Sequence, residues 1–259
     1  MTKIIVITSG KGGVGKTTTA INLGAAINHF GEEVVVIDAN LSTPNVGIHL
    51  GSPEVPVSLN HVMQNKAEMY EAVYKHESGL KIIPSSISMK ESDQTDTSNL
   101  KNFKKEIRSI SDYVIVDSAA GLGEEALSAM DLADEIIIVT NPEMPAITDA
   151  LKAVKCAEKK KKPILGVIVT RVKKNNIEMQ SETVREMLEV PILGMIPEDE
   201  CVSESLSMKN AVVHTHPKSK ASRAYKEIAA KITGKHYNSK DDEESIFEKI
   251  AKVFSKNRF

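Results

Sequence analysis

The sequence predicts an α/β fold: a doubly wound, mostly parallel β-sheet flanked by helices. Three observations predict it. Short apolar runs alternate with amphipathic stretches along most of the 259 residues. A glycine-rich turn, residues 10–17, lies between the first apolar run and the first helical stretch. Polar residues follow nearly every apolar run, where the carboxyl ends of parallel strands lie and where such sheets bind ligands.

Seven apolar runs have the length and the β-branched composition of buried strands. They are residues 4–7, 34–37, 80–84, 113–116, 136–139, 164–169 and 192–196, of which 80–84 is the weakest. Helices are predicted at 17–30, before Gly31, and at 219–233, before Gly234, because glycine is the common residue just beyond a helix end. The polar segment 85–98 predicts a surface loop.

Composition limits the class of protein. The net charge of −2 gives no general attraction to nucleic acid, so nucleic acid is an unlikely partner. The two cysteines, Cys156 and Cys201, are far apart and have no metal-ligand spacing, which is typical of a reduced intracellular protein. No apolar run approaches the ~20 residues that cross a bilayer, and a predicted strand begins the chain directly, so we expect no signal peptide. A cytoplasmic location is expected.

The glycine-rich turn matches the phosphate-binding pattern G-x-x-x-x-G-K-[ST]. Such a turn leaves several backbone N–H groups unpaired at the positive end of a helix dipole, which together form a cradle for phosphate. Lys16 can reach the β- and γ-phosphates, and the Thr17 hydroxyl can ligate Mg²⁺. The nucleotide-binding residues that we expect are Gly10, Lys11, Gly12, Gly13, Val14, Gly15, Lys16, Thr17 and Thr18.

Two further residues stand out near this turn. Asp117 follows the run 113–116, where a carboxylate can bind Mg²⁺ opposite Thr17. Taken alone, an Asp at a strand end is usually a turn or cap residue, and only the phosphate loop favours the metal role. Lys11 is a second lysine in the loop. It is either a solvated charge or a cation that reaches phosphates across a dimer interface, like a finger supplied in trans.

The stretch from Lys11 to Thr18 resembles the deviant phosphate loop of the MinD/ParA ATPases, and within them the MinD branch with its archaeal relatives. The resemblance covers roughly residues 1–233 in order. It includes the motifs Val36-Ile37-Asp38, Val116-Asp117-Ser118, Thr140-Asn141-Pro142-Glu143 and Ile196-Pro197-Glu198-Asp199. It implies a P-loop NTPase of the SIMIBI type that binds ATP or ADP with Mg²⁺.

The resemblance also implies roles for individual residues. Two nucleotides would lie face to face in a homodimer, with Lys11 acting on the partner's ATP beside the catalytic Lys16. Asp38 would lie near the attacking water and the metal, so that Thr17, Asp38 and Asp117 would surround Mg²⁺. Pro197 and Glu198 would lie against adenine.

One position departs from the family. Where members usually carry the Asp that orients the hydrolytic water, this chain has Asn40. An amide can orient water by hydrogen bonding but cannot accept its proton. Because phosphoryl transfer depends mainly on positioning and charge stabilisation, hydrolysis need not vanish. We expect slow turnover and a long-lived ATP dimer.

The chain divides into an ATPase domain (1–234), a flexible acidic linker (235–244) and an amphipathic helix (245–259). Five apolar residues of this helix form one stripe, with lysines off it. They are Ile246, Phe247, Ile250, Val253 and Phe254. A basic amphipathic helix at a chain end favours peripheral binding to an anionic membrane surface, as in the similar helix that ends MinD proteins. The alternative is a helix that packs on the domain itself.

Together these patterns predict an ATP-dependent dimerising switch that binds membrane and positions an activator or cargo protein, at the division site or at a cell pole. Two alternatives stay open. A ParA-like DNA-partitioning ATPase needs a basic surface for nonspecific DNA binding, which the near-neutral charge disfavours. An ATP-binding scaffold with little hydrolysis is compatible with Asn40.

Overall fold

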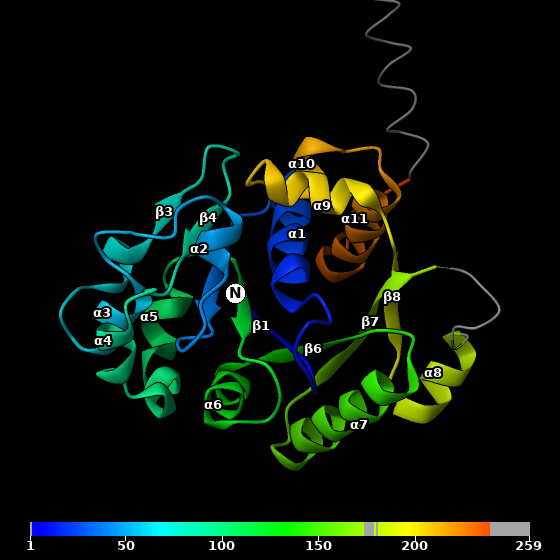
Figure 1. Cartoon of the computed structure of the whole chain (residues 1–259), viewed down its shortest axis with the longest axis horizontal. Coiled ribbons are helices and arrows are strands. Elements are labelled where there is room, and N and C mark those ends of the chain that lie inside the picture. The colour runs from blue at the N-terminus through cyan, green and yellow to red at the C-terminus, as the bar shows by residue number, and fades with distance from the viewer. Residues whose placement is uncertain (1, 174–178, 180, 239–259) are drawn as a thin grey trace, which may run out of the picture.

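The computed structural model describes residues 2–173, 179 and 181–238. Its strands form one sheet in the order β3-β4-β2-β5-β1-β6-β7-β8, with helices on both faces (Figure 1). The strands are β1 (Lys3–Thr8), β2 (Val34–Ala39), β3 (Tyr74–Lys75), β4 (Lys81–Ile83), β5 (Tyr113–Ser118), β6 (Glu135–Thr140), β7 (Ile164–Val172) and β8 (Ile192–Pro197). The doubly wound α/β prediction is confirmed. The predicted membrane helix, residues 245–259, lies outside the described residues.

The seven predicted strands correspond to β1, β2 and β4 to β8, and all their pairings with one another are parallel. The sequence did not predict β3, which pairs with β4 in antiparallel orientation. β3 has two residues, which is too short for an apolar alternation to be visible. A two-residue edge strand also leaves little unpaired backbone exposed.

Most helices connect consecutive strands across the two faces of the sheet, as parallel pairing requires. The α-helices are α1 (Lys16–His29), α2 (Val46–His49), α3 (Leu59–Met63), α4 (Met89–Asp93), α5 (Lys104–Arg108), α6 (Glu124–Leu132), α7 (Met144–Lys159), α8 (Ser181–Leu188), α9 (Glu200–Ser207), α10 (Val212–Thr215) and α11 (Lys220–Thr233). Two 3₁₀ helices, η1 (Met69–Ala72) and η2 (Thr97–Phe103), lie on the side of β3 and β4.

The central strands are apolar on both faces, and their side chains alternate between two cores. In β1, Ile5 and Ile7 pack in the core that contains the apolar residues of α1, α10 and α11. Ile4 and Val6 point the other way, into the core formed with α6, α7 and α8. Burial on both faces explains why these strands are continuous apolar runs rather than alternating ones.

The segment 85–98 lies mostly at the surface, as predicted, but the prediction that it is a loop was wrong. It contains α4 and the start of η2, and both Ser85 and Thr95 are buried. The Thr95 hydroxyl accepts hydrogen bonds from the side-chain amides of Asn60 and Gln64. The Ser85 hydroxyl donates to the main-chain oxygen of Asp38 at 2.6 Å. These polar residues are used internally, and Ser85 supports the end of β2.

The last described residues pack against the far end of α1. The ring of Tyr237 lies 6.0 Å from that of Phe30, in an edge-to-face arrangement. The Lys226 ammonium lies 5.8 Å from the centroid of the same tyrosine ring, and Lys235 pairs with Glu32 at 2.9 Å. The chain therefore leaves the domain at the end of α1 that is remote from the phosphate loop.

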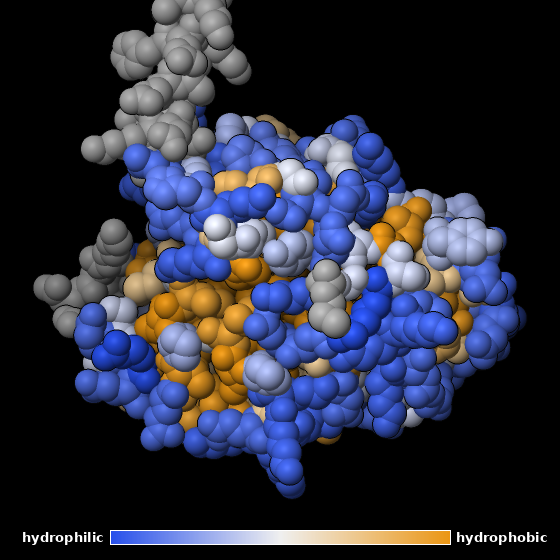
Figure 2. All heavy atoms as spheres, turned by 180° about the vertical axis from the view of Figure 1, so that it is seen from behind, coloured by the Kyte–Doolittle hydropathy of each residue, from blue (hydrophilic) through white to orange (hydrophobic). Residues whose placement is uncertain are grey.

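The outer surface is mainly polar. Figure 2 shows the face opposite to that of Figure 1, where hydrophilic residues predominate and the larger of the apolar areas lies at the lower left. Among the described residues, none of the helices has the combination of length and apolar character that crossing a bilayer demands.

Candidate functional site

The glycine-rich turn forms an open cradle between β1 and α1. Gly15 takes the left-handed conformation with φ 91°, which suits glycine, and it precedes a helix whose N-terminus no side chain caps. No acidic residue lies in the first helical turn. The amide groups there, and the positive end of the helix dipole, are therefore left for an anion from outside the chain.

Neighbouring strands hold this loop in place. The Thr170 hydroxyl, at the end of β7, donates to the main-chain oxygen of Val14 at 2.6 Å. The Asn141 amide, just beyond β6, donates to the Thr170 main-chain oxygen at 3.2 Å. A Cβ added at Gly10 would lie 1.9 Å from the main-chain oxygen of Asp149 in α7, so only glycine fits. The sequence placed Asn141 and Thr170 at the ligand edge but did not reveal their role as supports.

Thr17 and Asp117, which are 100 residues apart, meet beneath the cradle. The Thr17 hydroxyl donates to Oδ2 of Asp117 at 2.5 Å. The other carboxylate oxygen, Oδ1, is buried and has no hydrogen-bond partner among the described residues. A buried anionic oxygen without a partner is costly, and oxygen is the ligand that Mg²⁺ prefers. Thr17 and Asp117 thus fit a magnesium ion.

Asp38 occupies the adjacent position of the sheet, because β2 and β5 pair Asp38 with Asp117 in register. Its carboxylate accepts three backbone N–H groups of the following loop, from Asn40 at 3.1 Å, Asn45 at 2.8 Å and Val46 at 2.9 Å. Asp38 therefore fixes the 40–46 loop, and both of its oxygens are already engaged. Its predicted place near metal and water stays a prediction, with Asp117 better suited to direct ligation.

Two buried carboxylates lie side by side with little positive charge to balance them. Burial raises the pKa of Asp38 from 3.8 to about 7, and the neighbouring Asp117 adds to the effect. Burial also raises the pKa of Asp117 to about 6, against the opposing influence of the Thr17 hydroxyl and Lys16. Burial lowers the pKa of Lys16 below its usual 10.5. A divalent cation would supply the missing charge.

These pKa shifts predict how stability depends on pH without magnesium. The unfolded chain loses both protons near pH 4, whereas the folded chain keeps them until pH 6 to 7. The folded state therefore binds more protons between about pH 4 and 7, and the free energy of unfolding falls as pH rises through that window. We expect Asp117→Asn to be about 2 kcal/mol more stable than the wild type at about pH 8.

Urea unfolding in metal-free, nucleotide-free buffer measures this difference. The stability gain of Asp117→Asn should shrink as the pH falls and approach zero only below 3.8, where the carboxyl is protonated in both the folded and the unfolded chain. Added Mg²⁺ should stabilise the wild type and leave the variant unchanged. A variant that is less stable than the wild type at about pH 8 would contradict the assignment of a strained carboxylate pair.

Asn40 is buried, and Thr43 engages both ends of its amide. The Asn40 Nδ2 group donates to the Thr43 main-chain oxygen at 2.5 Å, and the Thr43 hydroxyl donates to Asn40 Oδ1 at 3.0 Å. The amide closes a small turn within the loop that Asp38 holds. These two bonds use one N–H group and one lone pair of the amide, so Asn40 keeps one donor and one acceptor site for water but has no group that could accept a proton from it.

Lys11 lies at the rim of the loop and is partly exposed. The Ser9 hydroxyl donates to its main-chain oxygen at 2.7 Å, which fixes the backbone at this point. Within the described part of the chain, the Lys11 ammonium pairs with neither a carboxylate nor a hydrogen-bond acceptor. The geometry leaves this charge available to a ligand outside the subunit.

Pro197 and Glu198 line a pocket that begins at the phosphate loop. Gly15 and Thr18 form one end of the pocket, and Tyr225 of α11 also contributes to its wall. The lining also includes Val202 and Leu206 of α9, so apolar side chains lie beside the phosphate cradle, as a base attached to bound phosphates would require. The structure thus places the predicted adenine segment beside the predicted phosphate site.

Comparison with known proteins identifies the family. The profile of the ParA family, described as "NUBPL iron-transfer P-loop NTPase", matches residues 1–233. The chain belongs to the MinD/ParA family of P-loop ATPases. It is 36% identical over 250 residues to an uncharacterised ATP-binding protein of Methanocaldococcus jannaschii, which covers 96% of this chain and 95% of that protein.

Solved MinD structures have the same fold as this ATPase. The septum site-determining protein MinD of Pyrococcus horikoshii, complexed with Mg-ADP, superposes with a TM-score of 0.85 at 32% identity, covering 90% of this chain and 96% of that one. A chain of the MinC:MinD cell division protein complex of Aquifex aeolicus gives a TM-score of 0.81 at 30% identity, covering 91% and 97%. ATP hydrolysis and the binding of nucleotide with Mg²⁺ are properties of this family.

Proposed function

We propose that this ATPase is a switch that dimerises when it binds ATP, attaches to an anionic membrane surface through its C-terminal helix and positions a partner protein there. Hydrolysis would return it to a monomer that leaves the membrane. A partner that docks on the dimer would be the activator or the cargo. The Aquifex aeolicus MinC:MinD complex supports a protein partner of this kind.

The observation that carries this proposal is the Lys11 ammonium at the rim of a preformed phosphate cradle, where none of residues 2–173, 179 and 181–238 pairs with it. In a face-to-face dimer, each Lys11 would meet the phosphates held by the other subunit. The grip on the triphosphate would then be complete only in the dimer. Nucleotide state and oligomeric state would be linked through one residue.

Within each subunit, the residues divide the work. The amides of the first turn of α1 and the Lys16 ammonium bind the β- and γ-phosphates. Thr17 and Asp117 hold Mg²⁺, which neutralises charge on those phosphates. Asp38 fixes the 40–46 loop against the site through its three amide bonds. Pro197 and Glu198 face the base.

The membrane affinity of the tail would depend on the oligomeric state, because two linked tails bind more tightly than one. Its five apolar side chains would each contribute ~1.5–3 kcal/mol if fully buried, but burial at a membrane surface is partial. Ordering the helix costs on the order of 1 kcal/mol per residue. One tail therefore binds weakly. A dimer carries two, and the second binds at high effective concentration, which raises the apparent affinity ~10²–10⁴-fold.

We expect liposomes with anionic lipids to pellet the full-length protein with a non-hydrolysable ATP analogue and far less with ADP. A chain truncated after Lys240 should stay in the supernatant with both nucleotides. Ile250→Asp, on the apolar stripe, should behave like the truncated chain while still dimerising. Pelleting that does not depend on the nucleotide would eliminate the switch.

In the alternative, the C-terminal helix packs on its own domain, and an apolar surface is available for it. Apolar residues gather in one area of the face shown in Figure 2. If the helix docks there, the truncation would destabilise the domain, and liposomes would pellet neither the full-length nor the truncated chain. A salt-sensitive gel shift with DNA, without liposome binding, would instead favour DNA partitioning.

A scaffold that binds ATP and scarcely hydrolyses it is the second candidate, and one observation favours it. Thr43 bonds to both ends of the Asn40 amide and holds it within the loop, and the amide has no group that could take a proton from water. Phosphate release at saturating ATP separates the two. A switch needs turnover that is faster with its partner and membrane present, whereas a scaffold shows none under either condition.

A further inference from the structure

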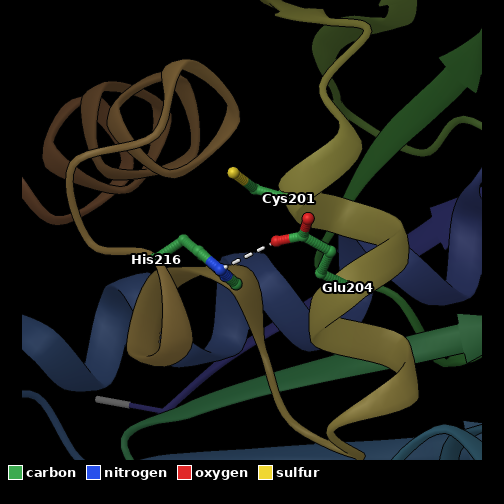
Figure 3. Close-up of side chains that lie close together, drawn as sticks. All are labelled: Cys201, Glu204 and His216. Atoms are coloured by element: carbon green, nitrogen blue, oxygen red, sulfur yellow. Dashed lines mark ion pairs between the residues drawn. The ribbon is translucent and has the colours of Figure 1, made fainter.

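Three potential metal ligands meet at a place apart from the phosphate loop. Figure 3 shows Cys201 and Glu204 on α9 and His216 just after α10, with their side chains turned towards one another. One ligand atom from each residue lies within 4.8 Å of the others. Cys201 and Glu204 are three residues apart, so one face of the helix presents both.

The imidazole of His216 is oriented from both sides. Its Nε2 atom lies 3.1 Å from Oε2 of Glu204. Its Nδ1 atom is 2.9 Å from the Thr215 hydroxyl. Metal-binding histidines characteristically use the second ring nitrogen in such a hydrogen bond, which fixes the ring and its tautomer. The Thr215 hydroxyl, which is outside the cluster, thus orients the ring so that Nε2 faces Glu204.

The backbone at Cys201 is equally well fixed. Asp199 caps α9 by accepting the Cys201 N–H group through Oδ1 at 3.1 Å, and its Oδ2 accepts the N–H group of Ala221 at 3.0 Å. This carboxylate therefore joins the beginning of α9 to α11. The Asp199 carboxylate also hydrogen-bonds the Cys201 side chain, so the thiol is oriented at the beginning of α9, while Glu204 is exposed and pairs with His216.

The chemistry of the three ligands selects the metal. Sulfur and imidazole nitrogen with one carboxylate suit Zn²⁺, whereas Mg²⁺ and Ca²⁺ prefer oxygen alone. A thiolate and a carboxylate together balance the charge of one divalent ion. Zinc with ligands at about 2.0–2.3 Å requires ligand atoms roughly 3.5 Å apart. Small side-chain rotations of Cys201 and Glu204 would close the present separation.

We propose that Cys201, Glu204 and His216 bind one zinc ion, with the fourth position open to water. The thiol loses its proton to solvent as the Zn–S bond forms. The bound ion would cross-link α9 with the segment after α10. Since α9 also contributes Val202 and Leu206 to the pocket beside Pro197, the ion would brace one wall of the proposed base site.

Cobalt titration of the reduced, metal-free, full-length protein tests this site, with Mg²⁺ in excess to occupy the phosphate site. We expect one equivalent of Co²⁺ to give thiolate-to-cobalt charge-transfer absorption and the visible bands of tetrahedral coordination, and Zn²⁺ to displace it. Cys201→Ser should abolish the charge-transfer band. His216→Ala should weaken binding at least about tenfold.

The chain contains its own matched control, because its other cysteine, Cys156, lies on α7. Cys156→Ser should give the wild-type cobalt spectrum. Zinc should raise the melting temperature of the wild type and of Cys156→Ser, but not that of Cys201→Ser. Absence of the charge-transfer band in the wild type would overturn the proposal and leave an ion pair between His216 and Glu204. The same follows if the band persists in Cys201→Ser.

Discussion

Replacing Lys11 with alanine should lower the rate of ATP hydrolysis about 10³-fold while each subunit still binds ATP. A cation that stabilises the transferring phosphoryl group contributes 10³–10⁵-fold in related phosphoryl-transfer enzymes. The loop amides, Lys16 and the Thr17–Asp117 pair remain in place in this variant, so nucleotide binding is kept. Phosphate release at saturating ATP, together with equilibrium binding of a fluorescent nucleotide, measures both quantities.

A mixture of two inactive variants shows whether Lys11 acts across the interface. Lys11→Ala holds ATP but lacks the rim lysine, whereas Lys16→Ala has the rim lysine but a weakened grip on its own nucleotide. If Lys11 serves the partner's ATP, the mixture should recover part of the activity that each variant lacks alone. If Lys11→Ala hydrolyses ATP and dimerises like the wild type, the proposed role of this lysine is wrong.

Asn40→Asp should accelerate hydrolysis by at least about tenfold. A positioned general base usually accelerates a reaction 10²–10⁴-fold. We expect less here, because phosphoryl transfer depends mainly on positioning and charge stabilisation. The Asn40 amide donates to the Thr43 carbonyl, which a carboxylate cannot do. The Asp variant should therefore open the 40–43 turn and direct its carboxylate towards water. Single-turnover phosphate release compares the two chains.

Asn40→Ala is the matched control for that experiment. It also removes the contacts with Thr43 but supplies no carboxylate, so its turnover should not exceed that of the wild type. Equal acceleration by alanine and aspartate would mean that the Thr43 contacts, and not the missing base, restrain hydrolysis. An unchanged rate in Asn40→Asp would remove position 40 from the explanation of slow turnover.

The sequence predicted those features that short stretches of chain determine. Continuous apolar runs revealed the buried parallel strands, and the spacing from Gly10 to Thr17 revealed the cradle, because both follow from neighbouring residues. The Thr17–Asp117 pair was expected because both lie at the ligand edge of a parallel sheet. Predicting these features requires only the hydrophobic periodicity of the sequence and the parallel direction of the strands.

Features that depend on distant packing were not predictable in this way. Thr170 supports Val14 across 156 positions, and no local pattern marks it. Ser85 and Thr95 look like loop residues by composition, yet tertiary contacts bury them and use their hydroxyl groups. Similarly, nothing in the spacing of Cys201 and His216 shows that α9 and the segment after α10 meet. The fold creates these relationships.

Residues 235–238 lie at the end of α1 that is remote from the phosphate loop. This placement limits how ATP binding can affect membrane attachment in the proposed switch. This helix has 14 residues, which at 1.5 Å each makes a rod about 21 Å long. The γ-phosphate site and residues 235–238 are at its opposite ends, so a bound nucleotide does not touch the place where the chain leaves the domain. In the proposed switch, ATP would therefore regulate attachment through the number of tails in each monomer or dimer. A dimer held together by other means should then bind membrane without nucleotide.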